Sequence, residues 1–261
     1  MIKESFIFLP KISERKERKI WQHASTWNEF LDKKEIPGIA QKLKHGYDKI
    51  LVAAREALIA DDASYFARLV HSADQWRLYA HFKDDAVFLD IETASNYGNV
   101  TVVGLSDGRE TKTLIAGSTL TKENLQEALK PYKLLVTFNG KSFDIPILQK
   151  YFNTQFNMPH IDLKHVCFSA GITGGLKLIE KQLGIQRAEQ VKDVQGSDAD
   201  LLWRKWRATG NQDFLDLLVQ YNAEDCINLK TVAERVIPQL WKDVRGASPD
   251  IILPSSDGGR R

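Results

Sequence analysis

Cysteine is scarce in this sequence, which has only Cys167 and Cys226 among its 261 residues. Two cysteines exclude a disulfide-stabilised scaffold and a zinc site built from several thiolates, and they favour a reducing compartment. The sequence also lacks any apolar run that approaches the ~18 residues needed to span a membrane. Residues 1–5 do not have the pattern of a signal peptide. We therefore expect a cytoplasmic protein that does not contact a membrane.

An excess of charge of either sign is also missing, since 36 Lys and Arg residues face 34 Asp and Glu residues for a net charge of +2. This balance excludes a protein that coats nucleic acid with massed basic residues. Hydrophobic residues make up 43% of the chain and charged residues 27%, which excludes a disordered or collagen-like polypeptide. A chain of this length is expected to form one or two domains with a substantial core.

The first 80 residues have the spacing of helices and no convincing strand. Apolar residues recur at helical intervals over residues 16–30 and again over 43–58. Pro10 and the pair Pro37-Gly38 interrupt the pattern. We predict a small all-helical N-terminal domain over residues 1–80.

The pattern changes at residue 86 to short apolar runs separated by turns. Strands are predicted at 86–89, 100–105, 113–116 and 134–138, and helices at 144–152, 162–169, 174–183, 197–208 and 211–236, with a further helix capped by Thr121. This order predicts an α/β domain over residues 81–245. Residues 246–261, which are rich in proline, serine and glycine, are predicted to form a flexible tail.

Asp90 and Glu92 lie at the end of the first predicted strand. Because side chains alternate along a strand, both carboxylates share one face, where they repel each other and a divalent cation would remove the repulsion. A strand that simply runs into solvent explains the same Asp-x-Glu pattern. Asp144 follows the fourth predicted strand, where it is either a further ligand or the N-cap of the next helix.

Asp225 lies on the apolar stripe of the last long helix. The stripe begins at Phe214, passes through Tyr221 and Asp225, and resumes at Leu229. A carboxylate at a core-facing position requires a cation, hydrogen-bond donors or a metal ion. Tyr221 precedes Asp225 by four residues and is therefore its neighbour on one helix face, whereas Glu224 is expected to point elsewhere, into solvent.

These three segments, residues 88–93, 139–144 and 221–225, resemble the three exonuclease motifs of the DnaQ-like (DEDD) superfamily in order and spacing. The tyrosine four residues before the last aspartate resembles the DEDDy subclass, because the histidine subclass has His at the position of Gln220. More narrowly, the chain resembles the YprB-like ribonuclease-H-like proteins. Further stretches that carry this resemblance are residues 76–79, 174–177, 183–185 and 198–203, and the whole match covers about residues 65–236.

The resemblance implies a ribonuclease-H-like fold, in which helices flank a mixed five-stranded sheet. It also implies 3′→5′ exonuclease activity with two Mg²⁺ or Mn²⁺ ions, held by Asp90, Glu92, Asp144 and Asp225. Carboxylate oxygens are ligands that suit these ions. Tyr221 is expected to orient the attacking water, because a phenol with a pKa of about 10 is a poor base at neutral pH.

Several residues are candidates for substrate contacts, each with a structural alternative. Asn139 is either a contact to the 3′ end or a turn residue, and Phe143 either stacks on a base or packs in the core. The densest cluster of cations near the proposed site either contacts phosphates or forms a solvated helix face. It comprises Arg204, Lys205 and Arg207.

The N-terminal region contains two segments, residues 9–13 and 36–40, that resemble the hairpins of helix-hairpin-helix modules. Such hairpins grip DNA phosphates through backbone N–H groups. Their usual glycines are eroded here to Gly38 alone, so the module is degenerate. Lys11 and Lys16 lie at the first hairpin, and residues 1–80 carry 14 basic and 11 acidic side chains. These features favour either sequence-independent DNA binding or a purely structural helical cap.

The leading hypothesis is a metal-dependent 3′→5′ exonuclease that acts on single-stranded DNA, with RNA as the other substrate considered. The alternatives are a structure-selective endonuclease on the same fold and a non-catalytic adaptor that binds nucleic acid. The sequence indicates no protein partner.

Overall fold

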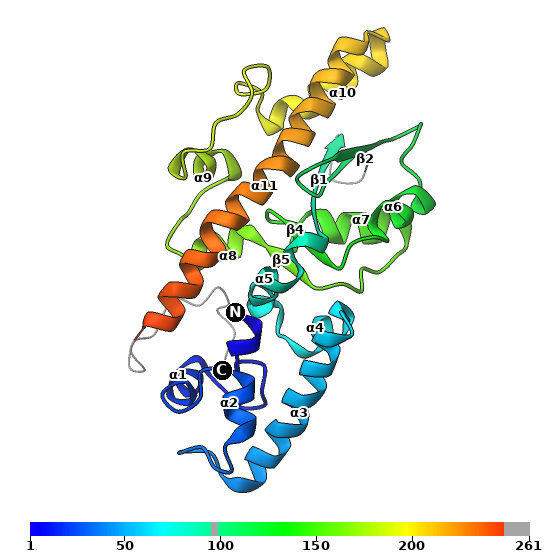
Figure 1. Ribbon diagram of the computed structural model, residues 1–261. Helices are drawn as coiled ribbons and strands as arrows, with labels where there is room; N and C mark the ends of the chain where they lie inside the picture. Colours follow the sequence, from blue (N-terminus) through cyan, green and yellow to red (C-terminus); the bar gives the residue numbers. More distant parts are fainter. Residues whose placement is uncertain (95–98, 248–261) are drawn as a thin grey trace.

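A five-stranded mixed sheet forms the centre of the protein in the computed structural model, which describes residues 1–94 and 99–247 (Figure 1). The strands are β1 (Ala86–Ala94), β2 (Asn99–Ser106), β3 (Thr111–Ile115), β4 (Leu134–Thr137) and β5 (His160–Asp162), in the order β3-β2-β1-β4-β5. β1, β2 and β3 pair antiparallel, whereas β4 and β5 run parallel to β1. The predicted ribonuclease-H-like α/β architecture is confirmed.

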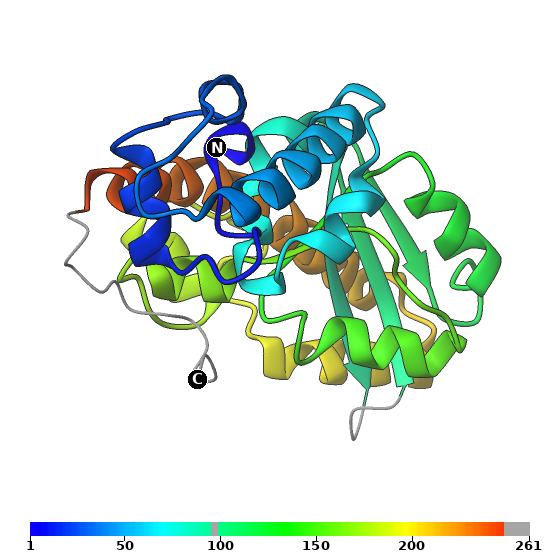
Figure 2. The ribbon, with the colours of Figure 1, turned by 90° about the horizontal axis from the view of Figure 1, so that it is seen from below.

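Helices cover both faces of this sheet, and β1 shows why each face is apolar (Figure 2). Val87, Leu89 and Ile91 pack on one side, against α6 (Lys122–Leu129) and α7 (Asp144–Phe152). Phe88 points to the opposite side, where the core includes residues of α8 (Leu163–Ser169) and α11 (Gln212–Gly246). The alternation along β1 therefore sends every second residue toward α11.

Two further helices complete the α11 side of the domain. α10 (Gly196–Thr209) packs against β1 and α11, and α9 (Leu176–Gln182) packs against α11. The five helices predicted between residues 144 and 236 are all present, and all their bounds except the end of the last helix lie within a few residues of those expected. Thr121 caps α6, since its Oγ1 accepts the backbone N–H of Asn124 at 3.1 Å.

The sequence predicts that the last helix stops at residue 236, and this end is too early. The helix instead continues through Pro238 to Gly246. An interior proline costs about 3 kcal/mol, but Ile237 just before it and Leu240 and Val244 beyond it are all buried in the main core. Burial of three such side chains is worth more than the lost hydrogen bond.

The helical pattern over residues 16–30 is also corrected, because two helices occupy this stretch rather than one. They are α1 (Glu14–Trp21) and α2 (Trp27–Asp32). Thr26 ends the break by accepting the backbone N–H of Glu29, whose carboxylate in turn accepts the N–H of Ser25 at 2.8 Å. This reciprocal capping gives the second helix its own start.

The remaining elements before β1 are all helical, and those within residues 1–80 agree with the helices predicted there. They are η1 (Ile2–Glu4), α3 (Gln41–Ile59), α4 (Ala63–Leu69), η2 (Ser72–Leu78), α5 (Tyr79–Phe82) and η3 (Lys83–Asp85). In Figure 1, α1 lies beside the C-terminal end of α11. Trp21 of α1 meets Trp241 of α11 edge-on, with ring centroids 5.8 Å apart.

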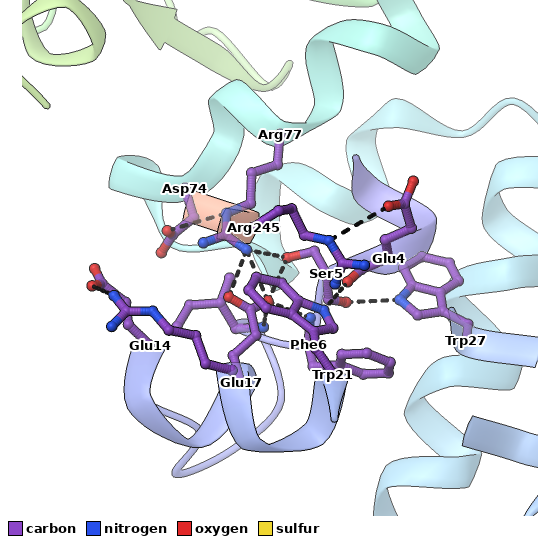
Figure 3. Close-up of polar contacts among 12 residues, drawn as sticks. Glu4, Ser5, Phe6, Glu14, Glu17, Trp21, Trp27, Asp74, Arg77 and Arg245 are labelled. Carbon is purple, nitrogen blue, oxygen red and sulfur yellow. Dashed lines mark hydrogen bonds and ion pairs between the residues drawn. The ribbon is translucent and has the colours of Figure 1, made fainter. Parts of the chain in front are cut away.

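A buried polar network ties the N-terminal segment to η2 (Figure 3). Glu17 accepts a hydrogen bond from Arg77 at 2.8 Å and from the backbone N–H groups of Phe6 and Ile7 at 2.6 and 2.9 Å. Arg77 also donates to Ser5 Oγ at 2.6 Å. The Glu17 and Arg77 side chains are only 1% and 2% exposed, so this ion pair is part of the protein interior.

One apolar core runs through both predicted domains. Phe6, Trp27 and Leu51 from the N-terminal region belong to the same buried cluster as Phe88 and Val232. The domain boundary near residue 80 stays a prediction. The apolar core continues across it without a break. Of the predicted tail, Gly246 closes α11, and residues 248–261 lie outside the described residues. Among the described residues, no helix has the length and apolar character to cross a membrane.

Candidate metal centre

β1 directs Asp90 and Glu92 to the α11 face of the sheet. The two residues pair with Gly104 and Val102 of β2, and Ile91 between them is buried on the opposite face. Glu92 is buried and Asp90 is half-buried. The strand therefore does not simply run into solvent, and both carboxylates lie beneath a packed helix.

α11 approaches the sheet closely at this point because Gly104 has no side chain. A Cβ atom at residue 104 would lie 2.2 Å from Asn222 Oδ1 and 2.7 Å from Cys226 Sγ. Asn222 uses this proximity to donate its Nδ2 hydrogens to the Asp90 carboxylate at 2.8 Å and to the Asp90 carbonyl at 3.2 Å. The contact fixes the orientation of Asp90.

Three carboxylates converge between β1 and α11. Asp90, Glu92 and Asp225 each place one oxygen within 4.8 Å of the other two. Asp225 is buried, at the core-facing position that the apolar stripe of α11 predicts. Asp144, at the start of α7, is buried and accepts the backbone N–H of Ile91 at 3.1 Å, which places it beside the two β1 acids. The structure thus brings together all four predicted acids, although Asp144 lies outside the tight group of three.

The electrostatics of this cluster are unfavourable without a cation. Burial raises the pKa of Asp90, of Glu92 and of Asp144, the last to about 7. The charges of Asp225 and Asp144 raise the pKa of Asp90 and Glu92 further. A divalent ion would remove this repulsion, and a site made only of carboxylate oxygens suits a hard ion of the Mg²⁺ type. The donor set therefore fits a metal centre.

Arg187 is a member of the site that the sequence does not predict. Its Nη2 donates a short hydrogen bond to Asp225 Oδ1, while Nε and Nη2 hold Glu180 at 2.6 and 2.8 Å. Burial raises the pKa of Asp225, and the Arg187 charge opposes that rise. Glu180 lies in a helix too short to show an apolar stripe, and Arg187 lies in a loop without periodicity. Neither residue therefore leaves a signal in the sequence pattern.

Tyr221 lies one helical turn before Asp225 and is buried beside it. Burial raises the pKa of its phenol, and the nearby charges of Asp225, Glu92 and Asp90 raise it further. A hydrogen bond from Tyr221 in turn lowers the pKa of Asp225. Two cations lie over the Tyr221 ring, with Arg187 Cζ at 5.7 Å and Lys177 Nζ at 5.3 Å from its centroid. The phenol therefore keeps its proton at neutral pH.

The loop between β4 and α7 carries Asn139 and Phe143. Asp162, at the end of β5, accepts the backbone N–H groups of Asn139 and Lys141 at 2.8 and 3.0 Å. Asn139 has a φ of 63° and accepts hydrogen bonds from Ser142 and from Lys164 Nζ. Phe143 packs against the apolar cluster of α6 and α7. Both residues have a structural role, and their contact with substrate stays a prediction.

The basic candidates on α10 are exposed and engage neighbouring side chains. Arg204 pairs with Asp200 at 2.9 Å. Lys205 Nζ lies 5.3 Å from the Phe214 ring centroid, and Arg207 Cζ lies 5.7 Å from that of Trp206. The two tryptophans of α10 contact each other and are half-buried. Contact of these three cations with nucleic acid stays a prediction.

The two N-terminal hairpins form equivalent turns. Ile12 N–H donates to Leu9 carbonyl at 3.1 Å, and Ile39 N–H donates to Ile36 carbonyl at 3.0 Å. The third residue of each turn has a positive φ, 62° at Lys11 and 81° at Gly38, and both are exposed. Lys16 is exposed too, and its Nζ donates to the Lys11 carbonyl at 3.1 Å.

The fold and the acidic cluster together define an RNase-H-like protein with a metal-type site. A family model described as RNase_H superfamily (RNase_H_2) matches residues 87–237, which include all the predicted acids. The chain belongs to the RNase H superfamily. This membership indicates nucleic-acid hydrolysis of the nuclease type, assisted by divalent ions. No curated protein sequence gives a significant match to the chain.

Proposed function

We propose that this protein is a metal-dependent 3′→5′ exonuclease of the DEDDy type that degrades single-stranded DNA, with RNA as a second substrate. The observation that carries the proposal is the convergence of Asp90, Glu92 and Asp225 in an RNase H superfamily domain. Asp144 adjoins this group, and Tyr221 lies one turn from Asp225. The order of these residues along the chain is that of the exonuclease motifs.

Asp90, Glu92, Asp144 and Asp225 are the residues that would hold two Mg²⁺ or Mn²⁺ ions. Bound ions of this kind activate a water and stabilise the leaving oxygen of a phosphodiester. Asn222 holds the Asp90 carboxylate, and Ile91 N–H holds that of Asp144. These contacts limit the freedom of the ligands before any ion arrives, which reduces the entropy that binding must overcome.

Tyr221 would act as a hydrogen-bond donor rather than a base. Its raised pKa keeps the phenol protonated across the physiological range. A protonated phenol orients a water or a phosphate oxygen, but it does not accept a proton from the nucleophile. The four carboxylates, not Tyr221, are then the groups whose ionisation controls activity.

Substrate contacts would come from three parts of the molecule. The β4–α7 loop offers Asn139 and Phe143 near Asp144, and α10 offers its exposed cations next to α11. The N-terminal turns offer Lys11, Lys16 and Gly38 at the starts of α1 and α3. Backbone N–H groups and cations of this kind bind phosphates without reading sequence.

The test is hydrolysis of labelled oligonucleotides by the wild-type protein and by Asp90→Asn, with Mg²⁺, with Mn²⁺ and with EDTA. Asp84→Asn is the matched control, because Asp84 is an exposed aspartate just before β1. We expect metal-dependent cleavage, reduced by more than about a hundredfold in Asp90→Asn and unchanged in Asp84→Asn. Equal activity of Asp90→Asn and the wild type would refute the proposal.

Further nucleic-acid substrates separate the alternatives. A circular single strand has no 3′ end, so its cleavage would indicate the endonuclease rather than the exonuclease. Matched DNA and RNA strands, single and double, determine the substrate preference. Binding of these strands without metal and without cleavage, unchanged in Asp225→Asn, would indicate the adaptor.

A further inference from the structure

Arg187 connects the candidate metal centre to a second acidic residue outside it. The guanidinium of Arg187 lies between Asp225 and Glu180. The side chains of Arg187, Asp225 and Glu180 are only 6%, 8% and 2% exposed. Glu180 does not bind the cluster of Asp90 and Glu92; it holds Arg187 through two hydrogen bonds of 2.6 and 2.8 Å. One buried cation therefore bridges a candidate metal ligand and a partner that is not a ligand.

The position of Arg187 is fixed from both sides. Asn228 lies one turn beyond Asp225 on α11. Its Nδ2 donates a hydrogen bond to Glu180 at 3.0 Å and so holds the Glu180 carboxylate in place. The backbone N–H of Ala188 donates to Glu224 Oε1 at 3.0 Å, which attaches the loop itself to α11. Glu224 is thus engaged with this loop rather than free in solvent. A guanidinium held this way stays beside Asp225 instead of swinging into solvent.

We propose that Arg187 is a positioning residue that holds one oxygen of Asp225, restrains the affinity of the site for divalent ions, and orients Asp225 for turnover. This inference rests on the proposed function of the same site. Arg187 takes Oδ1 of Asp225, so that only the other oxygen is free of the ion pair. The positive charge of Arg187 also opposes a second cation nearby, because like charges in a buried site repel strongly.

Removing Arg187 should then have two effects of opposite sign. Arg187→Met releases Oδ1 of Asp225 from the ion pair and removes a competing charge, so the affinity for Mn²⁺ rises on the order of tenfold. The same change leaves Asp225 without the ion pair that orients it, so kcat falls while KM for the oligonucleotide stays constant. A residue that contacts the substrate phosphate would instead change KM and leave metal binding alone.

The Glu180→Gln variant should change the affinity for Mn²⁺ in the opposite direction. Without the Glu180 carboxylate, the charge of Arg187 is directed at Asp225 alone, and the affinity for Mn²⁺ falls. Adding Arg187→Met to Glu180→Gln should restore the affinity. The double variant also avoids an unpaired buried charge at this pair, which keeps the comparison available if Arg187→Met alone fails to fold.

The experiment is calorimetric titration of the full-length, metal-free protein with Mn²⁺, in the absence of nucleic acid. Lys192→Met is the control, because Lys192 is an exposed cation in the same loop that pairs only with Glu189 among the contacts described. Steady-state hydrolysis then gives kcat and KM for each variant. Tighter Mn²⁺ binding in Arg187→Met, weaker binding in Glu180→Gln and recovery in the double variant support the inference.

Three results would overturn different parts of the account. If the wild type binds Mn²⁺ and both single variants bind it more weakly, Arg187 is merely a structural residue and the inference fails. A rise in KM with unchanged Mn²⁺ affinity in Arg187→Met also contradicts it, in favour of a phosphate contact. If the wild type binds no Mn²⁺ at all, the proposed function fails with it.

Discussion

The four acids of the site lower the stability of the metal-free protein. Asp144 illustrates the cost, because burial raises its pKa to about 7, whereas an unfolded aspartate titrates at about 3.9. Between these values the folded protein keeps a proton that the unfolded chain has released. The free energy of unfolding therefore falls as the pH rises through this interval. The raised pKa values of Asp90 and Glu92 act in the same direction.

We expect the melting temperature of the metal-free protein to fall between pH 6.5 and pH 8. Mn²⁺ should raise it more at pH 8, where Asp144 is ionised, than at pH 6.5. The interval begins at pH 6.5 because His160, whose pKa burial lowers to about 4, has the opposite effect at lower pH. Differential scanning fluorimetry measures both effects. Asp144→Asn should weaken the pH dependence, and a melting temperature independent of pH in the wild type would contradict the account.

Tyr221 gives a second prediction at the residue scale. Tyr221→Phe removes the hydroxyl that bonds to Asp225 but keeps the ring on which Arg187 and Lys177 lie. Because the phenol orients rather than accepts a proton, kcat should fall by roughly ten- to a hundredfold. The shape of the pH–rate profile should not change. Loss of the limb that rises from low pH in the variant would instead identify Tyr221 as the base.

At the scale of elements, the site depends on the close contact between α11 and β2. Gly104 leaves the space that Asn222 and Cys226 occupy, and these two residues flank the turn of α11 that also contains Asp225. Both the hydrogen bond from Asn222 to Asp90 and the packing of Cys226 therefore require a glycine at residue 104. A larger residue at 104 pushes the helix, and Asp225 with it, away from β1.

Gly104→Ala should destabilise the protein by about 1–3 kcal/mol, the usual cost of an overpacked core. It should also weaken Mn²⁺ binding, because Asp225 moves relative to Asp90. Urea unfolding and calorimetry measure the two quantities. Gly46→Ala is the control, since a Cβ there meets no atom within 4 Å. The account would be wrong if Gly104→Ala behaved like Gly46→Ala.

At the scale of the whole molecule, the N-terminal region is bound into the interior by Glu17 and Arg77. Glu17→Gln leaves the buried Arg77 without its main counter-ion, and such a loss typically costs about 3–5 kcal/mol. Glu14→Gln is the matched control. Glu14 lies in the same helix and pairs with Arg18, but its side chain is 35% exposed. We expect thermal melting to show a large loss for the first variant only. Equal melting temperatures would contradict this role for the pair.

The shared core also determines how nucleic-acid binding by this region is best measured. Deleting residues 1–80 would remove Trp76 and expose the apolar surface around Trp241 and Phe88, so charge reversal is preferable. Lys11→Glu together with Lys16→Glu should weaken DNA binding and lower its salt dependence. Lys130→Glu, at an exposed position, serves as control. Unchanged binding in the double variant would assign the N-terminal turns a structural role only.

Some features of this molecule follow from local patterns and others do not. The alternation in β1 predicts the common face of Asp90 and Glu92, and the stripe of α11 predicts the burial of Asp225. β5 has three residues, too few for alternation to appear, and α11 passes Pro238 because distant core residues hold it. Arg187 becomes part of the site through contacts between a loop and two helices, which no local pattern encodes. Periodicity thus predicts elements and faces, whereas partners between elements require the folded structure.

The near-neutral charge of the chain fits this account, because bound ions rather than massed lysines would meet the substrate. The most direct test uses two copies of one single-stranded oligonucleotide, labelled at the 5′ end and at the 3′ end, each incubated with the wild-type protein and Mn²⁺. The account predicts that the 3′ label is released at once as a mononucleotide, while the 5′ label appears in a ladder that shortens by single nucleotides. EDTA or Asp90→Asn should abolish both patterns. Release of the 5′ label first, or of the 3′ label in long fragments, would contradict the account.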